Sequence, residues 1–213
     1  RRTAGRVDRF VAISQYVRKR IQQYYGRDAD VVYPPVDTER CTPADTPAED
    51  FDLVVSALVP YKRVDLAVKA YTRSGQKLIV AGTGTDRRAL QEIAGPNIEF
   101  RGWLPDEAVL ELYRRCRALI FPGEEDFGIV PLEAQACGKP VVAYAGGGAL
   151  ETIEDGKTGV FFHKQTEQAL IDAADRCHKK RWDATVIRKH AQRFGTQAFI
   201  EGLKTSIEAC LSN

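Results

Sequence analysis

The sequence predicts an α/β domain with a doubly wound parallel sheet, which is a Rossmann-like sheet covered by helices on both faces. After Phe51, short apolar segments that read as strands alternate with helical segments about six times. The strand segments are continuously apolar rather than alternating, which is typical of parallel strands that are buried on both faces. The regular alternation of strand and helix then indicates the doubly wound arrangement.

Residues 1–50 precede this alternation and contain a first strand and a first helix. Ser14 ends a short apolar run and is a favourable N-cap for the helix that follows, which should stop at Gly26. A strand within 28–37 is interrupted by a proline pair, because proline cannot donate to a sheet ladder. The polar residues 37–50 are rich in proline and acid, so they read as a linker or surface arm.

The core domain is predicted at 51–195, followed by a C-terminal helix at 196–213. Its strands hold consecutive apolar residues and are expected at 51–59, 77–82, 97–104, 118–123, 140–144 and 158–162. Its helices have apolar residues at helical spacing, with glycine or proline near their ends, and are expected at 63–74, 86–95, 105–118, 129–138, 148–156, 166–180 and 183–194.

Composition excludes several classes of protein. The net charge of +2 over 213 residues argues against a dedicated nucleic-acid binder. Five scattered cysteines without a CxxC pair suit a reducing compartment and predict neither a disulfide framework nor a zinc site. No apolar run reaches the roughly 18–20 residues that a membrane span needs, so we expect a cytoplasmic protein. The chain has no methionine and opens RRTAGRVDRF, which indicates a fragment.

The acidic stretch 124–133, EEDFGIVPLE, follows one predicted strand and leads into a helix. Proline is tolerated only in the first turn of a helix, so Pro131 predicts that the helix begins near Gly128 and Ile129. Ligands of doubly wound sheets bind beyond the carboxyl ends of the strands, where a helix start favours an anion. The stretch therefore predicts a phosphate site, and Gly128 would let a ligand approach the backbone closely.

Two carboxylates flank this predicted phosphate site. Glu125 precedes the helix, and Glu133 lies about one turn inside it. Carboxylates repel phosphate, but they accept hydrogen bonds from neighbouring sugar hydroxyls. Lys62 and Arg63 follow the first core strand and can stabilise a diphosphate as charge develops on it. A nucleoside diphosphate sugar, with hydroxyls on both sides of a diphosphate, matches this set of residues.

Several segments resemble retaining glycosyltransferases of the GT-B fold, family 4, also called glycosyl transferases group 1. The acidic stretch is similar to their E-x7-E motif. VAISQYVRKRI and VVYPPVD resemble the segment that joins the two halves of these enzymes, and VVSALVPYKRVDLAV resembles their donor-phosphate loop. Further matches to the C-terminal, donor-binding half follow in order: LIVAGTG, IEFRGWLPDEAVLELYRRCRALIFP, EEDFGIVPLEAQACGKPVVA and GGALETIEDGKTGVFF.

The resemblance implies roles around the transferred sugar. Glu125 would contact its hydroxyls and is one candidate catalytic residue. The backbone of Phe127 and Gly128 would lie against the sugar. Ile129 and Val130 would lie against the diphosphate. Family members usually need no metal, so the resemblance implies neither a metal nor a cofactor.

The resemblance also implies roles for the rest of the donor. Lys62 would hold the diphosphate and is the second candidate catalytic residue. Glu133 would hold the ribose hydroxyls, and the turn with Trp103 and Leu104 would border the base. Gly82 opens the strand-end loop GTGTD, which is either a donor-binding loop or a plain turn. Trp103 itself is expected to be partly packed rather than a stacking platform for the base.

Two departures from the family pattern affect this interpretation. Family members often carry arginine where this chain has Ala57, and we expect Arg63 to supply the second positive charge instead. The family also has an N-terminal half of comparable size that binds the acceptor, and nothing in this sequence corresponds to it. The chain is therefore expected to bind donor but to transfer little or no sugar alone.

The resemblance favours a polysaccharide or lipid-linked acceptor, with GDP-mannose as the first donor and a UDP-sugar as the second. Two other classes remain open: a non-catalytic module that binds nucleotide sugars, and a nicotinamide-dependent oxidoreductase, suggested by VAGTGTD but lacking the third glycine of GxGxxG. The basic segment 176–182 reads as a solvated helix end or as a peripheral contact with an anionic membrane. The three histidines, which have no partners at ligand spacing, are expected at the surface.

Overall fold

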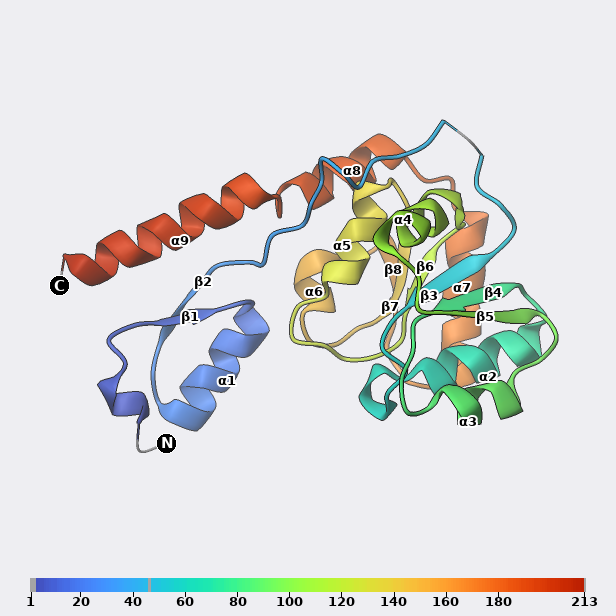
Figure 1. Cartoon of the computed structure of the whole chain (residues 1–213), viewed down its shortest axis with the longest axis horizontal. Coiled ribbons are helices and arrows are strands. Elements are labelled where there is room, and N and C mark those ends of the chain that lie inside the picture. The colour runs from blue at the N-terminus through green and yellow to red at the C-terminus, as the bar shows by residue number, and fades with distance from the viewer. Residues whose placement is uncertain (1–2, 46, 213) are drawn as a thin grey trace.

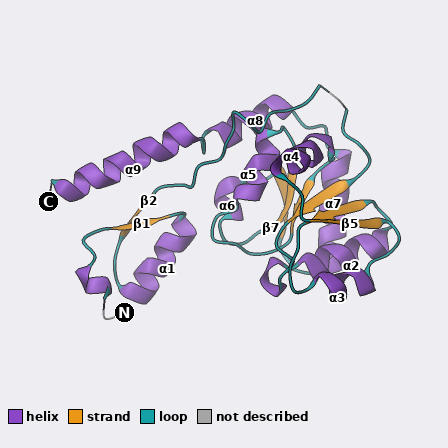
Figure 2. Cartoon of the chain, in the orientation of Figure 1, coloured by secondary structure: helices purple, strands orange, loops and turns teal. Residues whose placement is uncertain are grey.

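The computed structural model describes residues 3–45 and 47–212, and a six-stranded parallel sheet is its main feature (Figures 1 and 2). The strand order is β5-β4-β3-β6-β7-β8, and every neighbouring pair is parallel. The strands are β3 (Asp52–Val55), β4 (Leu78–Ala81), β5 (Ile98–Gly102), β6 (Leu119–Phe121), β7 (Val141–Tyr144) and β8 (Gly159–Phe162). The doubly wound α/β fold that the sequence predicts is confirmed.

Helices cover both faces of this sheet (Figure 1). One face carries α2 (Val64–Ser74), α3 (Arg87–Ile93) and α7 (Glu167–Lys179). The other face carries α4 (Asp106–Arg115), α5 (Ile129–Ala136), α6 (Ala149–Thr152) and α8 (Ala184–Gln192). Each helix lies within a segment for which the sequence predicts a helix.

Each face of the sheet has its own apolar core, because neighbouring residues of a strand point to opposite faces. Leu53 packs into the core under α4 and α5, whereas Val54 packs into the core under α2 and α7. The edge strand β5 differs from the inner strands, because its residues alternate between exposed and half-buried positions. The expectation of continuously buried strands therefore fails for β5 but holds for the opposite edge strand β8, whose four residues are all buried.

A smaller group of elements, here called the outer unit, consists of β1 (Phe10–Ala12), α1 (Gln15–Tyr25), β2 (Ala29–Val31) and α9 (Thr196–Leu211) (Figure 1, left). Strands β1 and β2 form a separate two-stranded parallel sheet.

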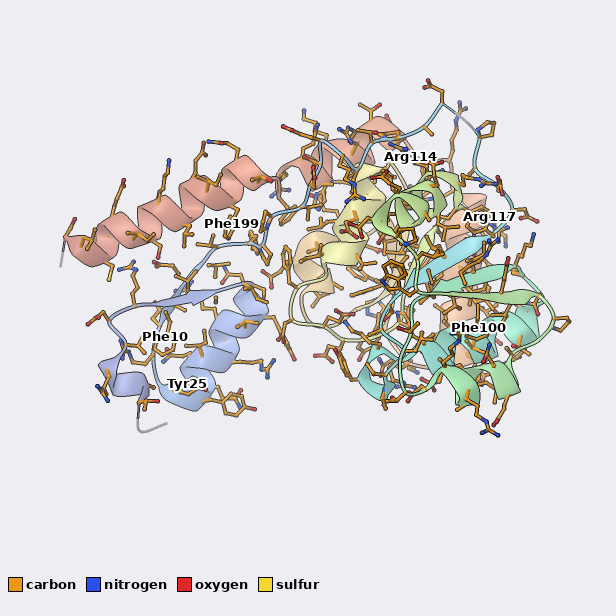
Figure 3. The ribbon with its side chains drawn as sticks, in the orientation of Figure 1. Phe10, Tyr25, Phe100, Arg114, Arg117 and Phe199 are labelled. Atoms are coloured by element: carbon orange, nitrogen blue, oxygen red, sulfur yellow. The ribbon has the colours of Figure 1, made fainter. Side chains whose placement is uncertain are left out.

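The predicted caps of α1 are confirmed, because the Ser14 side chain accepts from the Val17 N–H and Gly26 has a φ of 66°. Phe10 stacks on Tyr25 within the outer unit, with ring centroids 5.9 Å apart (Figure 3).

The C-terminal helix α9 leaves the six-stranded sheet and lies along β2 (Figures 1 and 3). Ser206 of α9 donates its hydroxyl to the Asp30 carboxylate at 2.6 Å. The described residues also form two short 3-10 helices, at Ala4–Arg6 and Pro60–Lys62. Among the helices of the described residues, none combines the length and apolarity required to span a bilayer.

Two of the three histidines are not surface residues, so that expectation is wrong for them. His190 is 7% exposed and contacts the Glu154 carboxylate and the Thr152 carbonyl. His178 is half-buried and contacts the fully buried Asp52 at 2.8 Å. These partners lie far away in the sequence, which explains why local spacing did not indicate them. His163 is exposed, as expected.

Candidate active site

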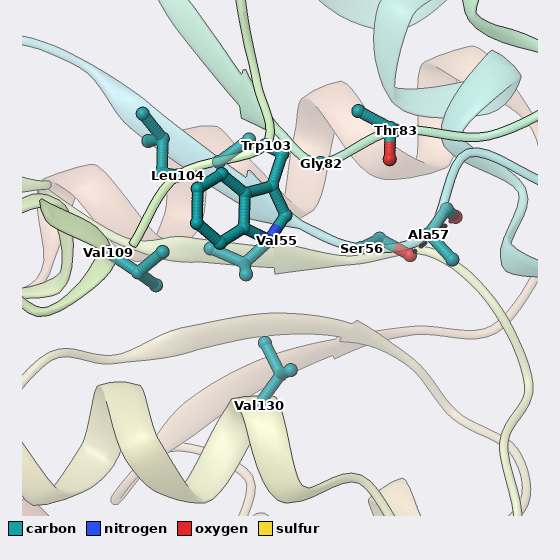
Figure 4. Close-up of a pocket in the computed structure, with 10 residues that line it drawn as sticks. Val55, Ser56, Ala57, Gly82, Thr83, Trp103, Leu104, Val109 and Val130 are labelled. Carbon is teal, nitrogen blue, oxygen red and sulfur yellow. Dashed lines mark hydrogen bonds between the residues drawn. The ribbon is translucent and has the colours of Figure 1, made fainter. Parts of the chain in front are cut away.

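The carboxyl ends of β3, β4 and β5 surround a cavity of about 370 Å³ that opposes the first turn of α5 (Figure 4). This edge is where doubly wound sheets bind ligands. The indole of Trp103 lies over one side of the cavity, and Val130 approaches from the helix on the other side (Figure 4). The lining residues are Val55, Ser56, Ala57, Ala81, Gly82, Thr83, Trp103, Leu104, Val109 and Val130.

Trp103 is 74% exposed, so the expectation that it is partly packed is wrong. The ring projects from the turn after β5, where Gly102 adopts a φ of 68°. An exposed indole face beside a largely apolar cavity is suited to contact with a flat aromatic ring. Leu104 follows in the same turn and lines the same cavity.

Gly82 is required by the close approach of β4 to β3 at this edge. Its φ is 132°, and a Cβ atom at this position would lie 1.9 Å from the Ser56 carbonyl oxygen. Any side chain would therefore push the two strand ends apart. Gly82 therefore lines the cavity with its backbone and allows the ends of β3 and β4 to lie close together.

A second cavity of about 230 Å³ shares Val55 and Val109 with the first. Glu133 lies here on the second turn of α5 and is half-buried. The Tyr113 hydroxyl donates to its Oε2 at 2.8 Å. Burial raises the pKa of the Glu133 carboxyl, and the hydrogen bond from Tyr113 opposes this shift.

Helix α5 begins at Ile129, as the position of Pro131 predicts. Gly128 precedes it with a φ of 101°, a conformation that favours glycine. No side chain of the described residues caps this helix start. The N–H groups of its first turn have no acceptor within the helix, so together with the helix dipole they favour an anion.

Lys62 and Glu125 form an ion pair beside this helix start. The Lys62 Nζ lies 2.5 Å from Oε2 of Glu125, and the two side chains are 17% and 19% exposed. The neighbouring acids Glu124 and Asp126 are exposed and contact α1 instead. Of the three consecutive acids, only Glu125 is turned toward the cation.

The loop that carries Glu125 rests on glycines that follow β7. Gly148 donates its N–H to the Glu125 carbonyl at 2.7 Å. A Cβ atom on Gly147 would lie 2.2 Å from that same carbonyl oxygen, and one on Gly148 would lie 2.3 Å from the Cα of Phe127. These glycines therefore serve a close backbone contact. The Phe127 ring is buried and stacks on Tyr33.

Arg63 does not join Lys62 at the helix start. Its backbone is left-handed, with a φ of 54°. Its guanidinium donates to Asp65 at 3.2 Å and to Gln165 at 2.8 Å. Ala57, where the family resemblance implies arginine, lines the first cavity and leaves that wall apolar.

A third cavity of about 680 Å³ separates α1 from the acidic loop. Its lining residues are Tyr16, Arg20, Tyr24, Tyr61, Lys62, Glu124, Glu125 and Asp126. Sequence reasoning gave no site role to Tyr16, Tyr24 and Arg20, because these residues of α1 lie about a hundred positions from the acidic loop they face. Tyr16 donates its hydroxyl to Glu124 at 2.8 Å, and Arg20 pairs with Asp126 at 2.6 Å.

The three cavities thus collect most of the residues that the sequence singles out. Within residues 3–45 and 47–212, no group of three or more histidine, cysteine or acidic side chains is arranged to hold a metal ion. The start of α5, the half-buried Lys62 and the carboxylates Glu125 and Glu133 are the polar groups that both the sequence and the structure place at these cavities.

Comparison with known proteins identifies the family. The family model described as "Glycosyl transferases group 1" matches residues 45–199. D-inositol 3-phosphate glycosyltransferase from Geodermatophilus obscurus is 32% identical over 95% of this chain and 52% of its own length. A GDP-mannose-dependent α-(1-6)-phosphatidylinositol monomannoside mannosyltransferase from Mycolicibacterium smegmatis is 32% identical over 81% of this chain and 53% of its own length.

Solved structures show the same fold. HepE from Anabaena, in complex with UDP and glucose, superposes with a TM-score of 0.81 at 21% identity, covering 93% of this chain and 62% of that one. Sucrose-phosphate synthase from Thermosynechococcus elongatus gives a TM-score of 0.81 at 21% identity, covering 95% and 58%. The chain spans about half the length of the curated relatives it matches. It belongs to the glycosyl transferases group 1 family, whose GT-B fold its parallel sheet and flanking helices share.

Proposed function

We propose that this chain is the donor-binding half of a retaining glycosyltransferase that transfers a sugar from a nucleoside diphosphate. The observation that carries this proposal is the position of the start of α5. One carboxylate, Glu125, lies in the loop before this helix start, and the other, Glu133, lies on the second turn of the helix. Glu133 faces the cavity that adjoins the Trp103 cavity, and Glu125 faces the cavity beside α1. A donor laid along this line would place its base near Trp103, its diphosphate at the helix start and its sugar at Glu125.

Glu133 is suited to the ribose hydroxyls. Tyr113 occupies Oε2, which leaves the second oxygen of the carboxylate for a ligand hydroxyl. Burial raises the pKa of this carboxyl, which is consistent with incomplete solvation of its charge. Two hydroxyl donors from a ribose would hydrogen-bond to the charged carboxylate and replace part of the solvation that burial removes. This gain would favour binding of the ribose.

Lys62 and Glu125 are proposed to exchange partners when the donor binds. In the structure they neutralise one another at 2.5 Å. A diphosphate at the helix start would attract the ammonium group of Lys62, and the sugar hydroxyls would become hydrogen-bond partners of Glu125. Lys62 would then stabilise the negative charge that grows on the departing nucleoside diphosphate.

The acceptor is proposed to enter through the cavity between α1 and the acidic loop. This cavity contains both members of the Lys62–Glu125 pair, so a hydroxyl that enters it approaches the proposed sugar position. Its exposed tyrosines offer apolar ring faces, and its charged side chains offer hydrogen-bond partners, a combination that suits a polysaccharide or lipid-linked sugar. The N-terminal half expected for the family would complete this side of the site.

The basic segment 176–182 is not part of this route. His178 contacts Asp52 at the first residue of β3, which is the edge of the sheet opposite the cleft. A membrane that contacted this segment would therefore face away from the cavities.

The first donor proposed is GDP-mannose and the second is a UDP-sugar. The M. smegmatis relative is named for its dependence on GDP-mannose, and the Anabaena structures hold UDP or UDP-glucose. Calorimetric titration of the chain with GDP, UDP, ADP and their sugar conjugates distinguishes these donors. Failure of every nucleotide to bind would contradict the proposal.

Two variants test the division of roles. Glu133→Gln should lower nucleoside diphosphate affinity by about tenfold, because a charged hydrogen-bond acceptor is lost. Glu125→Gln should spare the free nucleotide and weaken only the sugar conjugate. Glu111→Gln on the exposed side of α4 and Glu201→Gln on α9 are the matched controls. Equal losses for both ligands in both variants would refute the assignment.

A further inference from the structure

Two buried tyrosines each donate a hydrogen bond to a carboxylate. Tyr71 of α2 donates its hydroxyl to Oδ2 of Asp52 at 2.6 Å, and Tyr113 of α4 donates to Oε2 of Glu133 at 2.8 Å. The two tyrosines are 1% and 2% exposed. The pairs have the same chemistry, but their surroundings differ.

The Asp52 pair is closed to ligands. Asp52 is completely buried at the first residue of β3, which is the end of the strand opposite the cleft. Its carboxylate also contacts His178 at 2.8 Å and Arg117 at 3.3 Å. Together with Tyr71 these side chains surround the carboxylate, as a buried charge in a folded domain requires.

The Glu133 pair is open on one side. Glu133 is half-buried and lines the 230 Å³ cavity together with Tyr113. Among the side chains of residues 3–45 and 47–212, Tyr113 alone donates to this carboxylate, and it reaches only Oε2. Oε1 is therefore the acceptor that remains for a ligand hydroxyl in the cavity.

The Tyr113 hydroxyl is fixed by the packing of its ring. The ring belongs to the apolar core that also contains Leu132 and Ala134 of α5. The next residue, Arg114, attaches α4 to the segment between β2 and β3 through the carbonyl and the hydroxyl of Thr42, each at 2.9 Å. A ring in a close-packed core keeps its orientation, so the hydroxyl offers Glu133 a donor in one place.

The same hydrogen bond acts on the charge of Glu133. Burial raises the pKa of this carboxyl, and the hydrogen bond from Tyr113 opposes the shift. Of the other groups that face it, Asp106 raises the pKa and Arg40 lowers it, and Cys41 also lines the cavity. Tyr113 therefore both orients the carboxylate and favours its charged form.

We propose that Tyr113 is a positioning residue for the ribose of the donor: its hydroxyl holds the Glu133 carboxylate so that Oε1 accepts a hydrogen bond from a ribose hydroxyl. This role rests on the proposed function, in which Glu133 meets the ribose. The chain then distinguishes a ribonucleotide from the same nucleotide without its 2′ and 3′ hydroxyls. This selectivity depends on Tyr113, although Tyr113 does not touch the nucleotide.

The test compares GDP with 2′,3′-dideoxy-GDP, and UDP with 2′,3′-dideoxy-UDP, by calorimetric titration of the purified chain. The ratio of the two affinities isolates the ribose contacts, because base and diphosphate are the same within each pair of ligands. The chain should prefer the ribonucleotide by about tenfold, and Tyr113→Phe should reduce this preference to about threefold or less.

Tyr71→Phe is the matched control, because it removes the other buried tyrosine hydroxyl that donates to a carboxylate. It should lower the melting temperature and leave the affinity ratio unchanged, since Asp52 lies at the end of the sheet opposite the cleft. An equal change of the ratio in Tyr71→Phe would mean that general destabilisation, and not the position of Glu133, sets the preference.

A double variant tests whether Tyr113 acts through Glu133. Glu133→Ala removes the carboxylate, so adding Tyr113→Phe to it should not change the affinity ratio further. A further loss of preference in the double variant would mean that Tyr113 contacts the nucleotide itself, which would overturn the positioning role.

Acidification gives a readout that a merely structural role does not change. The preference for the ribonucleotide should fall as Glu133 becomes protonated. Loss of the Tyr113 hydrogen bond raises the pKa of Glu133, so in Tyr113→Phe the fall should occur at a higher pH. Arg40, Asp106 and Cys41 are the same in both proteins, so they do not account for a difference. Identical pH profiles would contradict the proposal.

The outcomes separate this role from the proposed function. If no nucleotide binds, the proposed function itself fails. If nucleotides bind without preference for the ribose, the assignment of Glu133 fails, and the role of Tyr113 fails with it. If the preference survives unchanged in Tyr113→Phe, only the role of Tyr113 is overturned. Circular dichroism verifies that each variant is folded.

Discussion

The six-stranded sheet and the outer unit are built from the same kinds of elements, but different forces hold them together. Each face of the six-stranded sheet lies over an apolar core. In contrast, α1 has no buried residue, and α9 buries only Ser206. Apolar side chains remain exposed across the outer unit, namely Val11, Ile13, Tyr24, Tyr25, Ile200, Ile207 and Leu211.

Polar contacts position the outer unit instead. Arg9 pairs with Asp30, and Ser206 donates to the same carboxylate. Glu151 of α6 accepts hydrogen bonds from the N–H groups of Gln15 and Tyr16 at 2.8 and 3.0 Å. A residue from the domain of the six-stranded sheet therefore caps the start of α1. The comparison teaches that the sheet carries its own hydrophobic stabilisation, whereas the wall of the proposed acceptor cavity depends on a few charged groups.

The largest expected effect tests the hydrophobic side of this comparison. Leu119 is completely buried in β6, so Leu119→Ala should lower the free energy of unfolding by about 3 kcal/mol through lost transfer energy and a residual cavity. Ile207 on α9 is 50% exposed, so Ile207→Ala should cost less than about 1 kcal/mol. Urea unfolding measures both. Similar losses in the two variants would show that the outer unit is as tightly packed as the sheet.

A smaller effect tests the polar attachment of α1. Glu151→Ala removes the acceptor for two backbone N–H groups of its first turn and for the Tyr33 hydroxyl. Amide hydrogen exchange should show protection in α1 reduced by about tenfold, with the strands of the sheet unchanged. Glu201→Ala on α9 is the control, because Glu201 is exposed. Equal loss of protection in β3 and β6 would mean that the two regions unfold together.

The sequence predicts the sheet well, because strands that are buried on both faces have continuously apolar sequences. Continuous apolar segments such as 140–144 give β7, and Pro131 places the start of α5 within one residue. The outer unit is predicted only element by element. Its capping residues are local in sequence and are confirmed. No local sequence pattern predicts that α9 contacts β2, because the two elements are far apart along the chain.

The site follows the same division. Pro131 and the spacing of Glu125 to Glu133 are local, so the sequence indicates the helix start and its flanking acids. The pairing of Lys62 with Glu125 and the cap from Glu151 join residues that are far apart along the chain, and no periodicity encodes them. The exposure of Trp103 depends on the direction of the turn at Gly102. The sequence does not give this direction, so a large apolar side chain was expected to be packed.

The smallest expected effect concerns two carboxyls, one in each region, whose pKa values shift in opposite directions. Hydrogen bonds from Arg9 and then from Ser206 lower the pKa of Asp30. Its contribution to stability is therefore present above its unfolded pKa of about 4 and is lost as the pH falls through the lower folded value. Burial raises the pKa of Glu133, so its charge opposes folding at neutral pH. That penalty disappears as the pH falls through the raised folded value.

Acidification should therefore act on the two regions with opposite sign. Between pH 7 and about pH 4.5 the sheet should gain slightly in stability, by less than about 1 kcal/mol. Below about pH 4 the amide NMR signals of α1 and α9 should lose dispersion before those of the sheet. Asp30→Asn should remove the acid-sensitive step, and Glu133→Gln should give the sheet its low-pH stability at pH 7. An acid-sensitive step that survives in Asp30→Asn would assign this step to another titrating group, such as Asp28, whose pKa the hydrogen bond from Arg18 also lowers.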